Sequence, residues 1–111
     1  MTLQDYQDAV DSWIKQYGVR YFDEMTNMVL LMEELGELAR LMSRKYGEQS
    51  FKSPEQSKHV EEDIKDEIAD IFFVLTCLSN QMNIDITESL KANLEKKTIR
   101  DKQRHRSNEK L

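Results

Sequence analysis

The chain is poor in the residues that interrupt helices: its 111 residues include one proline and three glycines. Proline and glycine are the residues least compatible with a helix interior. Leucine, methionine, alanine, glutamate and lysine, which form helices well, are abundant instead. The sequence therefore predicts an all-α protein.

The chain also has little cysteine and no long apolar segment. Cys77 is its single cysteine, so no disulfide framework is expected, and its apolar surroundings favour a small core residue over a nucleophile. The start, MTLQDYQDAV, is too polar for a secretory leader, and no apolar run reaches the length of a membrane span. We therefore predict a cytoplasmic protein with no membrane partner.

The net charge of −5 argues against a nucleic-acid partner for the whole chain. The C-terminal stretch is the exception, because basic residues recur along it (Lys91, Lys96, Lys97, Arg100, Lys102, Arg104, Arg106 and Lys110). Such a stretch is either a solvated helix end, where basic residues favour the helix dipole, or a patch that binds phosphate groups.

Apolar periodicity and capping residues predict four helices. We place them at about Leu3–Tyr17, Asp23–Tyr46 and Ser53–Met82, with a fourth that Thr87 caps and that fades into the basic stretch. The length suits one domain over residues 1–106, followed by a disordered tail at 107–111. Because so small a core leaves helix faces open, self-association is expected.

Two short acidic clusters interrupt the apolar stripes of the second and third predicted helices. Glu34 and Glu37 are one helical turn apart in the first cluster, and Glu67 and Asp70 are one turn apart in the second. At about 100° per residue, each pair lies on the same flank of its helix's apolar stripe. Antiparallel packing of the stripes would therefore bring four carboxylates to one edge of the interface.

Carboxylates gathered beside a core oppose one another unless a cation neutralises them. Four of them from two helices make an oxygen-rich site suited to Mg²⁺, with Mn²⁺ as a substitute. The simpler alternative is a charged helix edge with lysine or arginine partners. Glu33 and Asp63 lie close enough in sequence to add a ligand for a second ion or to orient a water.

The stretch around these acids resembles the MazG-type nucleotide pyrophosphohydrolases of the all-α NTP pyrophosphatase superfamily. That family's pattern, EExxE followed by ExxD, is present here as Glu33-Glu34-Leu-Gly-Glu37 and Glu67-Ile-Ala-Asp70. The apolar run after ExxD and the turn before the fourth helix also match. The likeness covers roughly residues 20 to 105 and is closest to a short, single-domain bacterial subgroup.

The resemblance implies a four-helix MazG-like bundle that oligomerises through helix packing, as a homodimer or homotetramer. It also implies hydrolysis of a nucleoside triphosphate to the monophosphate and pyrophosphate, in cleansing of the nucleotide pool. Glu34, Glu37, Glu67 and Asp70 match the family's Mg²⁺ ligands.

Two basic residues, Lys96 and Arg100, match residues that the family uses near the phosphates. Many relatives place an aromatic residue just after the first of these, where this chain has Lys97. Trp13 is a candidate to stack on the base, although a tryptophan at this helical spacing is more often a core residue.

A water deprotonated by a spare carboxylate, Glu33 or Glu37, would attack the linkage between the α- and β-phosphates. The sequence leaves open which carboxylate acts, and which base and sugar are preferred. The competing hypotheses are a nucleotide-binding regulatory helical module with little turnover, and a structural bundle whose acids only decorate its surface.

Overall fold

The computed structural model describes residues 1–111 and contains four α-helices and no strand. α1 (Leu3–Trp13) continues into a π-helical turn, η1 (Ile14–Gly18), in place of the single helix expected there. α2 (Glu24–Tyr46), α3 (Pro54–Gln81) and α4 (Ile86–Arg106) follow. The prediction of an all-α fold is confirmed, and none of the helices combines the length and apolar composition needed to cross a membrane.

The first three helices begin where their capping residues predict. Thr2 and Asp5 form a capping box, in which each side chain accepts a hydrogen bond from the other residue's backbone N–H, at 3.0 and 2.9 Å. Asp23 and Ser53 cap α2 and α3 by accepting from the N–H three residues further on. These caps fix the ends of the helices that carry the acids.

The predicted start of the fourth helix was wrong by two residues. The cap is Asp85, whose carboxylate accepts from the N–H of Glu88 at 3.2 Å, and not Thr87. An aspartate is a somewhat stronger cap than a threonine, so the earlier of the two capping residues starts the helix.

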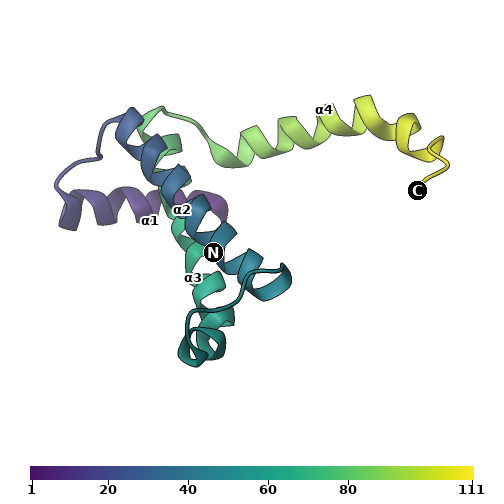
Figure 1. Ribbon diagram of the computed structural model, residues 1–111. Coiled ribbons are helices and arrows are strands. Elements are labelled where there is room, and N and C mark those ends of the chain that lie inside the picture. Colours follow the sequence, from purple (N-terminus) through teal and green to yellow (C-terminus); the bar gives the residue numbers. More distant parts are fainter.

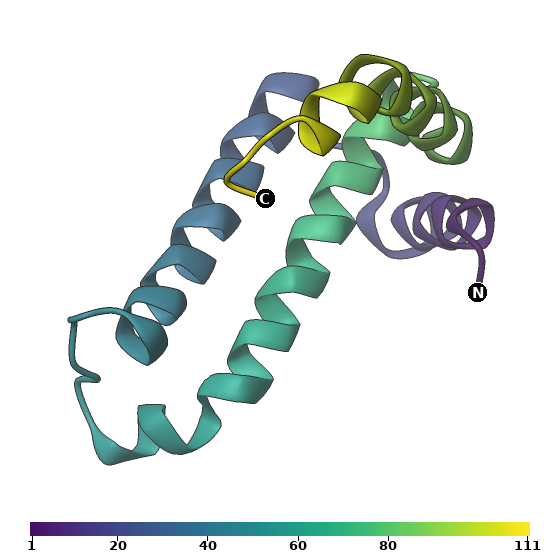
Figure 2. The ribbon, with the colours of Figure 1, turned by 90° about the vertical axis from the view of Figure 1, so that its right-hand side faces the viewer.

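α2 and α3 form an antiparallel hairpin in which the two helices run side by side (Figure 2). α1 packs against α3 near the end of the hairpin that leads into α4. The core at this end contains Val10, Ile14 and Cys77, with Tyr6, Tyr21 and Phe73 packed around them. The buried position of Cys77 agrees with its prediction as a core residue.

α4 projects away from the other three helices (Figure 1). It packs mainly against α1 and carries no buried residue. The radius of gyration is accordingly 18.0 Å, whereas a compact chain of this length would have about 13 Å. The single chain is therefore elongated.

Large apolar side chains remain exposed along the hairpin. Only nine of the 111 residues are buried, too few for a chain of this length to form a complete core by itself. On α2, Met25, Val29 and Met32 are 72, 53 and 58% exposed, and on α3 Phe72 is 54% exposed. These helix faces lack a packing partner within the chain.

Candidate functional site

The hairpin brings acids from both of its helices to one place. One carboxylate oxygen each of Glu34, Glu67 and Asp70 lies within 4.8 Å of the other two. Glu34 comes from the middle of α2, and the other two come from successive turns of α3. We call these three residues the acid triad.

Like charges act on one another within the triad. A hydrogen bond with Glu34, which requires a shared proton, is the largest cause that raises the pKa of Glu67 to about 7; burial and the charges of Glu34, Asp70 and Glu37 add to it. Burial, followed by the charges of Glu34 and Asp66, raises the pKa of Asp70. The metal-free triad therefore retains a proton that separate carboxylates would release near pH 4.5.

One oxygen of the triad has no partner at all. Oε2 of Glu67 is buried and makes no hydrogen bond. A buried carboxylate oxygen without a partner is costly, and a bound cation would remove the cost. Since all the available donors are hard oxygens, the residues fit a hard divalent cation such as Mg²⁺ or Mn²⁺.

Glu37, the fourth predicted ligand, lies at the edge of the triad. Its carboxylate forms an ion pair with Arg40 at 2.6 Å and is half exposed. Its charge nevertheless contributes to the raised pKa of Glu67. Glu37 is thus close enough to act on the triad electrostatically while its Oε2 is paired with Arg40.

Glu33 lies on a different side of α2. It borders a shallow apolar hollow with Met25, Val29 and Leu30, among the exposed side chains of that helix. The chain therefore separates the two candidate bases, Glu33 and Glu37, and only the second adjoins the acids.

Two arginines outside the acid motif lie next to Glu37. Arg40 and Arg44 border a hollow of about 160 Å³ with Glu37 and Asp63. The sequence signal was their spacing, three and seven residues after Glu37, which places all three on one helix face. They are positive groups beside the acids within the same chain.

The basic residues predicted to contact phosphates lie elsewhere. Lys96 is at the middle of α4 and Arg100 is one turn further out, and Figure 1 shows that helix running away from the hairpin. The guanidinium of Arg100 makes two hydrogen bonds to its neighbour Asp101, at 2.8 and 2.9 Å. A single chain therefore does not bring these two residues to its own acid triad.

Trp13 is neither a core residue nor free of contacts. It is 49% exposed, with its ring edge-to-face on Phe73 at 5.6 Å and tilted against Tyr17 at 5.6 Å. Phe73 follows Asp70 by one turn of α3. Trp13 thus contacts α3 one turn after Asp70.

The fold and the site define an all-α protein with a cluster of three carboxylates, suited to a divalent cation, between two antiparallel helices. The chain belongs to the MazG nucleotide pyrophosphohydrolase family, whose domain matches residues 22–105. It is therefore an enzyme, a hydrolase of nucleotide anhydride bonds. The resemblance inferred from EExxE and ExxD is confirmed.

The chain is similar to a named bacterial protein over most of its length. The chain is 42% identical over 103 residues to YpjD of Bacillus subtilis (strain 168), whose function is uncharacterised; the match covers 93% of this chain and 89% of YpjD. The crystal structure of B. subtilis YpjD is similar with a TM-score of 0.74 at 36% identity, over 86% of this chain and 92% of that one.

A second solved structure is that of the Bacillus-conserved MazG protein, described as a nucleotide pyrophosphohydrolase. It matches with a TM-score of 0.71 at 33% identity, over 86% of this chain and 88% of the other. Both matches support the fold class as well as the family.

The protonation of the triad gives a testable pH dependence of the metal-free protein. Because the pKa of Glu67 is higher in the folded chain (about 7) than in an unfolded one (4.5), the resulting stability is complete below pH 4.5 and lost as the pH rises through 7. In EDTA, the Tm should therefore fall between pH 5 and 7.5, and Glu67→Gln should reduce the fall. Thermal melts would contradict this if the two proteins gave parallel curves.

Proposed function

We propose that this protein is a Mg²⁺-dependent nucleoside triphosphate pyrophosphohydrolase. It cleaves a ribo- or deoxyribonucleoside triphosphate to the monophosphate and pyrophosphate, and so removes unwanted nucleotides from the pool. The observation that carries the proposal is the acid triad with its unpartnered Glu67 oxygen, in a chain of the MazG family.

Glu34, Glu67 and Asp70 would hold the cation, with Glu37 as a further ligand once its pairing with Arg40 loosens. A bound Mg²⁺ would supply Lewis acidity toward phosphate oxygens and toward water. With the cation present, the carboxylates of the triad could all be ionised, since its charge would replace the proton that Glu67 shares with Glu34 and would offset burial and repulsion.

Glu37 is the better-placed proton acceptor for the attacking water. It adjoins the triad, whereas Glu33 borders an apolar hollow on another side of α2. The water oxygen would bond to the α-phosphorus while its proton passes to the carboxylate and the bridging oxygen leaves with pyrophosphate. Glu33 remains the alternative base of the EExxE motif.

The phosphate-binding cations would come from a second copy of the chain. Lys96 and Arg100 lie on a helix that points away from its own acids, and that helix is basic whereas the hairpin surface is acidic. Exposed apolar faces on α2 and α3 offer surface for the same association. We therefore propose a homodimer or homotetramer in which α4 of one subunit completes the site of another.

Base recognition is assigned to Trp13. Its ring is half exposed and packs edge-to-face on Phe73, one turn after Asp70 on α3, and this contact holds the ring in place. Stacking accepts any base, so this contact alone would not select among them.

Substituting Glu67 tests the reaction directly. With a panel of ribo- and deoxyribonucleoside triphosphates and Mg²⁺, the wild type should release pyrophosphate, and Glu67→Gln should reduce turnover by about 100-fold through loss of a ligand charge. The matched control is Glu62→Gln, also on α3, where an exposed carboxylate pairs only with Lys65. Nucleotide binding without turnover in the wild type would instead support the regulatory module.

Mixing two variants that are impaired in different parts of the site, assayed at a triphosphate concentration where each alone has little activity, tests whether subunits share a site. Glu67→Gln lacks one carboxylate of the acid triad, and Lys96→Ala/Arg100→Ala lacks the proposed phosphate contacts. When the two are refolded together, half of the dimers are mixed and each has one intact site, so activity should return to about a quarter of the wild type. No recovery, measured as pyrophosphate release, would mean that each chain uses its own cations, with Arg40 and Arg44 as the available ones.

A further inference from the structure

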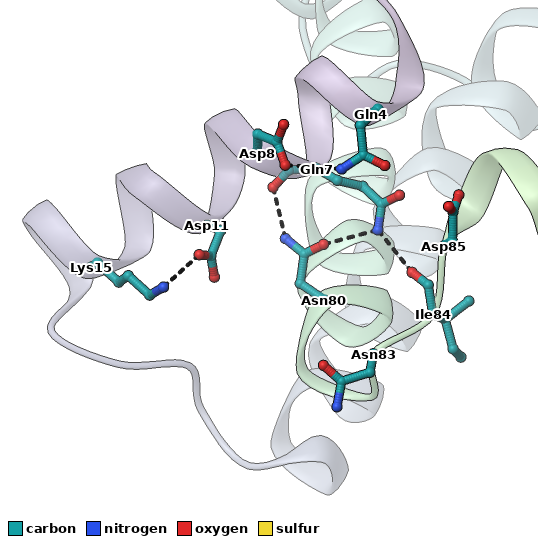
Figure 3. Close-up of a pocket in the computed structure, with 9 residues that line it drawn as sticks. All are labelled: Gln4, Gln7, Asp8, Asp11, Lys15, Asn80, Asn83, Ile84 and Asp85. Carbon is teal, nitrogen blue, oxygen red and sulfur yellow. Dashed lines mark hydrogen bonds and ion pairs between the residues drawn. The ribbon is translucent and has the colours of Figure 1, made fainter.

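The attachment of α4 to the rest of the chain depends on one buried side chain of α1. Gln7 is 6% exposed and lies where α1 meets the connection between α3 and α4. Figure 3 shows it at a cleft of about 450 Å³ that is lined mainly by polar residues.

The side-chain amide of Gln7 forms hydrogen bonds to this connection through both its nitrogen and its oxygen. Its Nε2 donates to the carbonyl of Ile84 and to Oδ1 of Asn80, both at 2.9 Å (Figure 3). Its Oε1 accepts from the N–H of Ile86 at 3.0 Å, and Ile86 is the first residue of α4. That N–H has no acceptor within the helix, so Gln7 supplies one.

Asn80 completes the arrangement from the end of α3. Its Nδ2 donates to the backbone carbonyl of Gln7 at 2.9 Å and to the hydroxyl of Tyr21 at 3.1 Å. The same hydroxyl donates to Asp11 at 2.7 Å. The Gln7 side chain therefore donates to the Asn80 side chain, and the Asn80 side chain donates back to the Gln7 backbone. The contact with Tyr21 further fixes the orientation of Asn80. We call Gln7 and Asn80 the amide clasp.

A small change in the angle at which α4 leaves the clasp would produce a large displacement of residues further along the helix. At a rise of 1.5 Å per residue, Lys96 and Arg100 lie about 15 and 21 Å along the helix axis from Ile86, so a tilt of about 10° moves Arg100 by about 4 Å. A displacement of that size is longer than a hydrogen bond. The direction in which α4 leaves the clasp therefore decides where its basic residues arrive.

We infer that Gln7 and Asn80 are positioning residues for the reaction: the amide clasp sets the direction of α4 and so places Lys96 and Arg100 at the triphosphate. The inference rests on the proposed phosphate role of those two residues. Gln7 itself lies outside residues 22–105, the part that matches the family. Through the clasp, a residue outside the family domain would influence the positions of phosphate-binding residues inside that domain.

The test uses Gln7→Met, which keeps the side-chain length but removes all three hydrogen bonds. We expect the KM for the preferred triphosphate to rise about tenfold, and inhibition by inorganic pyrophosphate to weaken equally, because the phosphate cations are misplaced. The Mn²⁺ affinity without nucleotide should stay unchanged. The matched control is Gln4→Met on the same helix, where an exposed amide bonds only to Asp8, and it should leave all three quantities unchanged.

Adding Gln7→Met to Lys96→Ala/Arg100→Ala separates positioning from a general loss of structure. If Gln7 acts through those cations, the substitution should have no further effect on KM in that background. The inference would be overturned if Gln7→Met raised KM equally in the wild type and in Lys96→Ala/Arg100→Ala, or if Gln7→Met alone left KM unchanged. Should Gln7→Met not fold, Gln7→Glu decides in the same way, because it keeps the acceptor for Ile86 and loses the two donated bonds.

The outcomes also distinguish this inference from the proposed function. If Lys96→Ala/Arg100→Ala leaves KM and pyrophosphate inhibition unchanged, the phosphate role itself is wrong and the inference falls with it. If that double variant raises KM while Gln7→Met does not, only the role of the clasp is wrong.

Discussion

Mutual repulsion among three carboxylates is the constraint on which this structure depends. Pairing α2 with α3 brings Glu34, Glu67 and Asp70 together, and in the absence of a cation the cluster retains a proton and leaves a buried oxygen unpartnered. A fold chosen for stability alone would separate these charges. The hairpin instead keeps the three charges together at a cost in stability, which suits a site for a divalent cation in a nucleotide pyrophosphohydrolase.

Two features of the single chain have no partner elsewhere in the chain: the positive charge of α4 and the apolar surface of the hairpin. α4 carries positive charge but points away from the acids, and the hairpin leaves apolar side chains exposed that one chain cannot cover. Association of subunits would both bring α4 to another subunit's acids and cover the exposed apolar side chains. Within its own chain α4 has little packing beyond its contact with α1. The amide clasp at its first turn would therefore set the direction in which α4 leaves its subunit.

Much of this arrangement could be predicted from local sequence rules. Capping residues located the starts of α1, α2 and α3, and the spacing of the acids on the apolar stripes identified three residues that do converge. The direction of α4 and the role of Gln7 could not be predicted, because both depend on bonds between residues more than 70 positions apart. The pairing of Glu37 with Arg40 could not be predicted either. The EExxE motif gives the position of Glu37 along α2, but the ion pair depends on side-chain conformation.

The most direct measurement of the central claim is the binding of Mn²⁺ followed by electron paramagnetic resonance, in wild type, Glu67→Gln and Glu62→Gln. If the triad forms the cation site, wild type and Glu62→Gln should bind the ion with equal affinity, and Glu67→Gln should bind it at least about tenfold more weakly. Equal binding by all three proteins would contradict the account, because the cation would then lie away from the acids that the hairpin brings together.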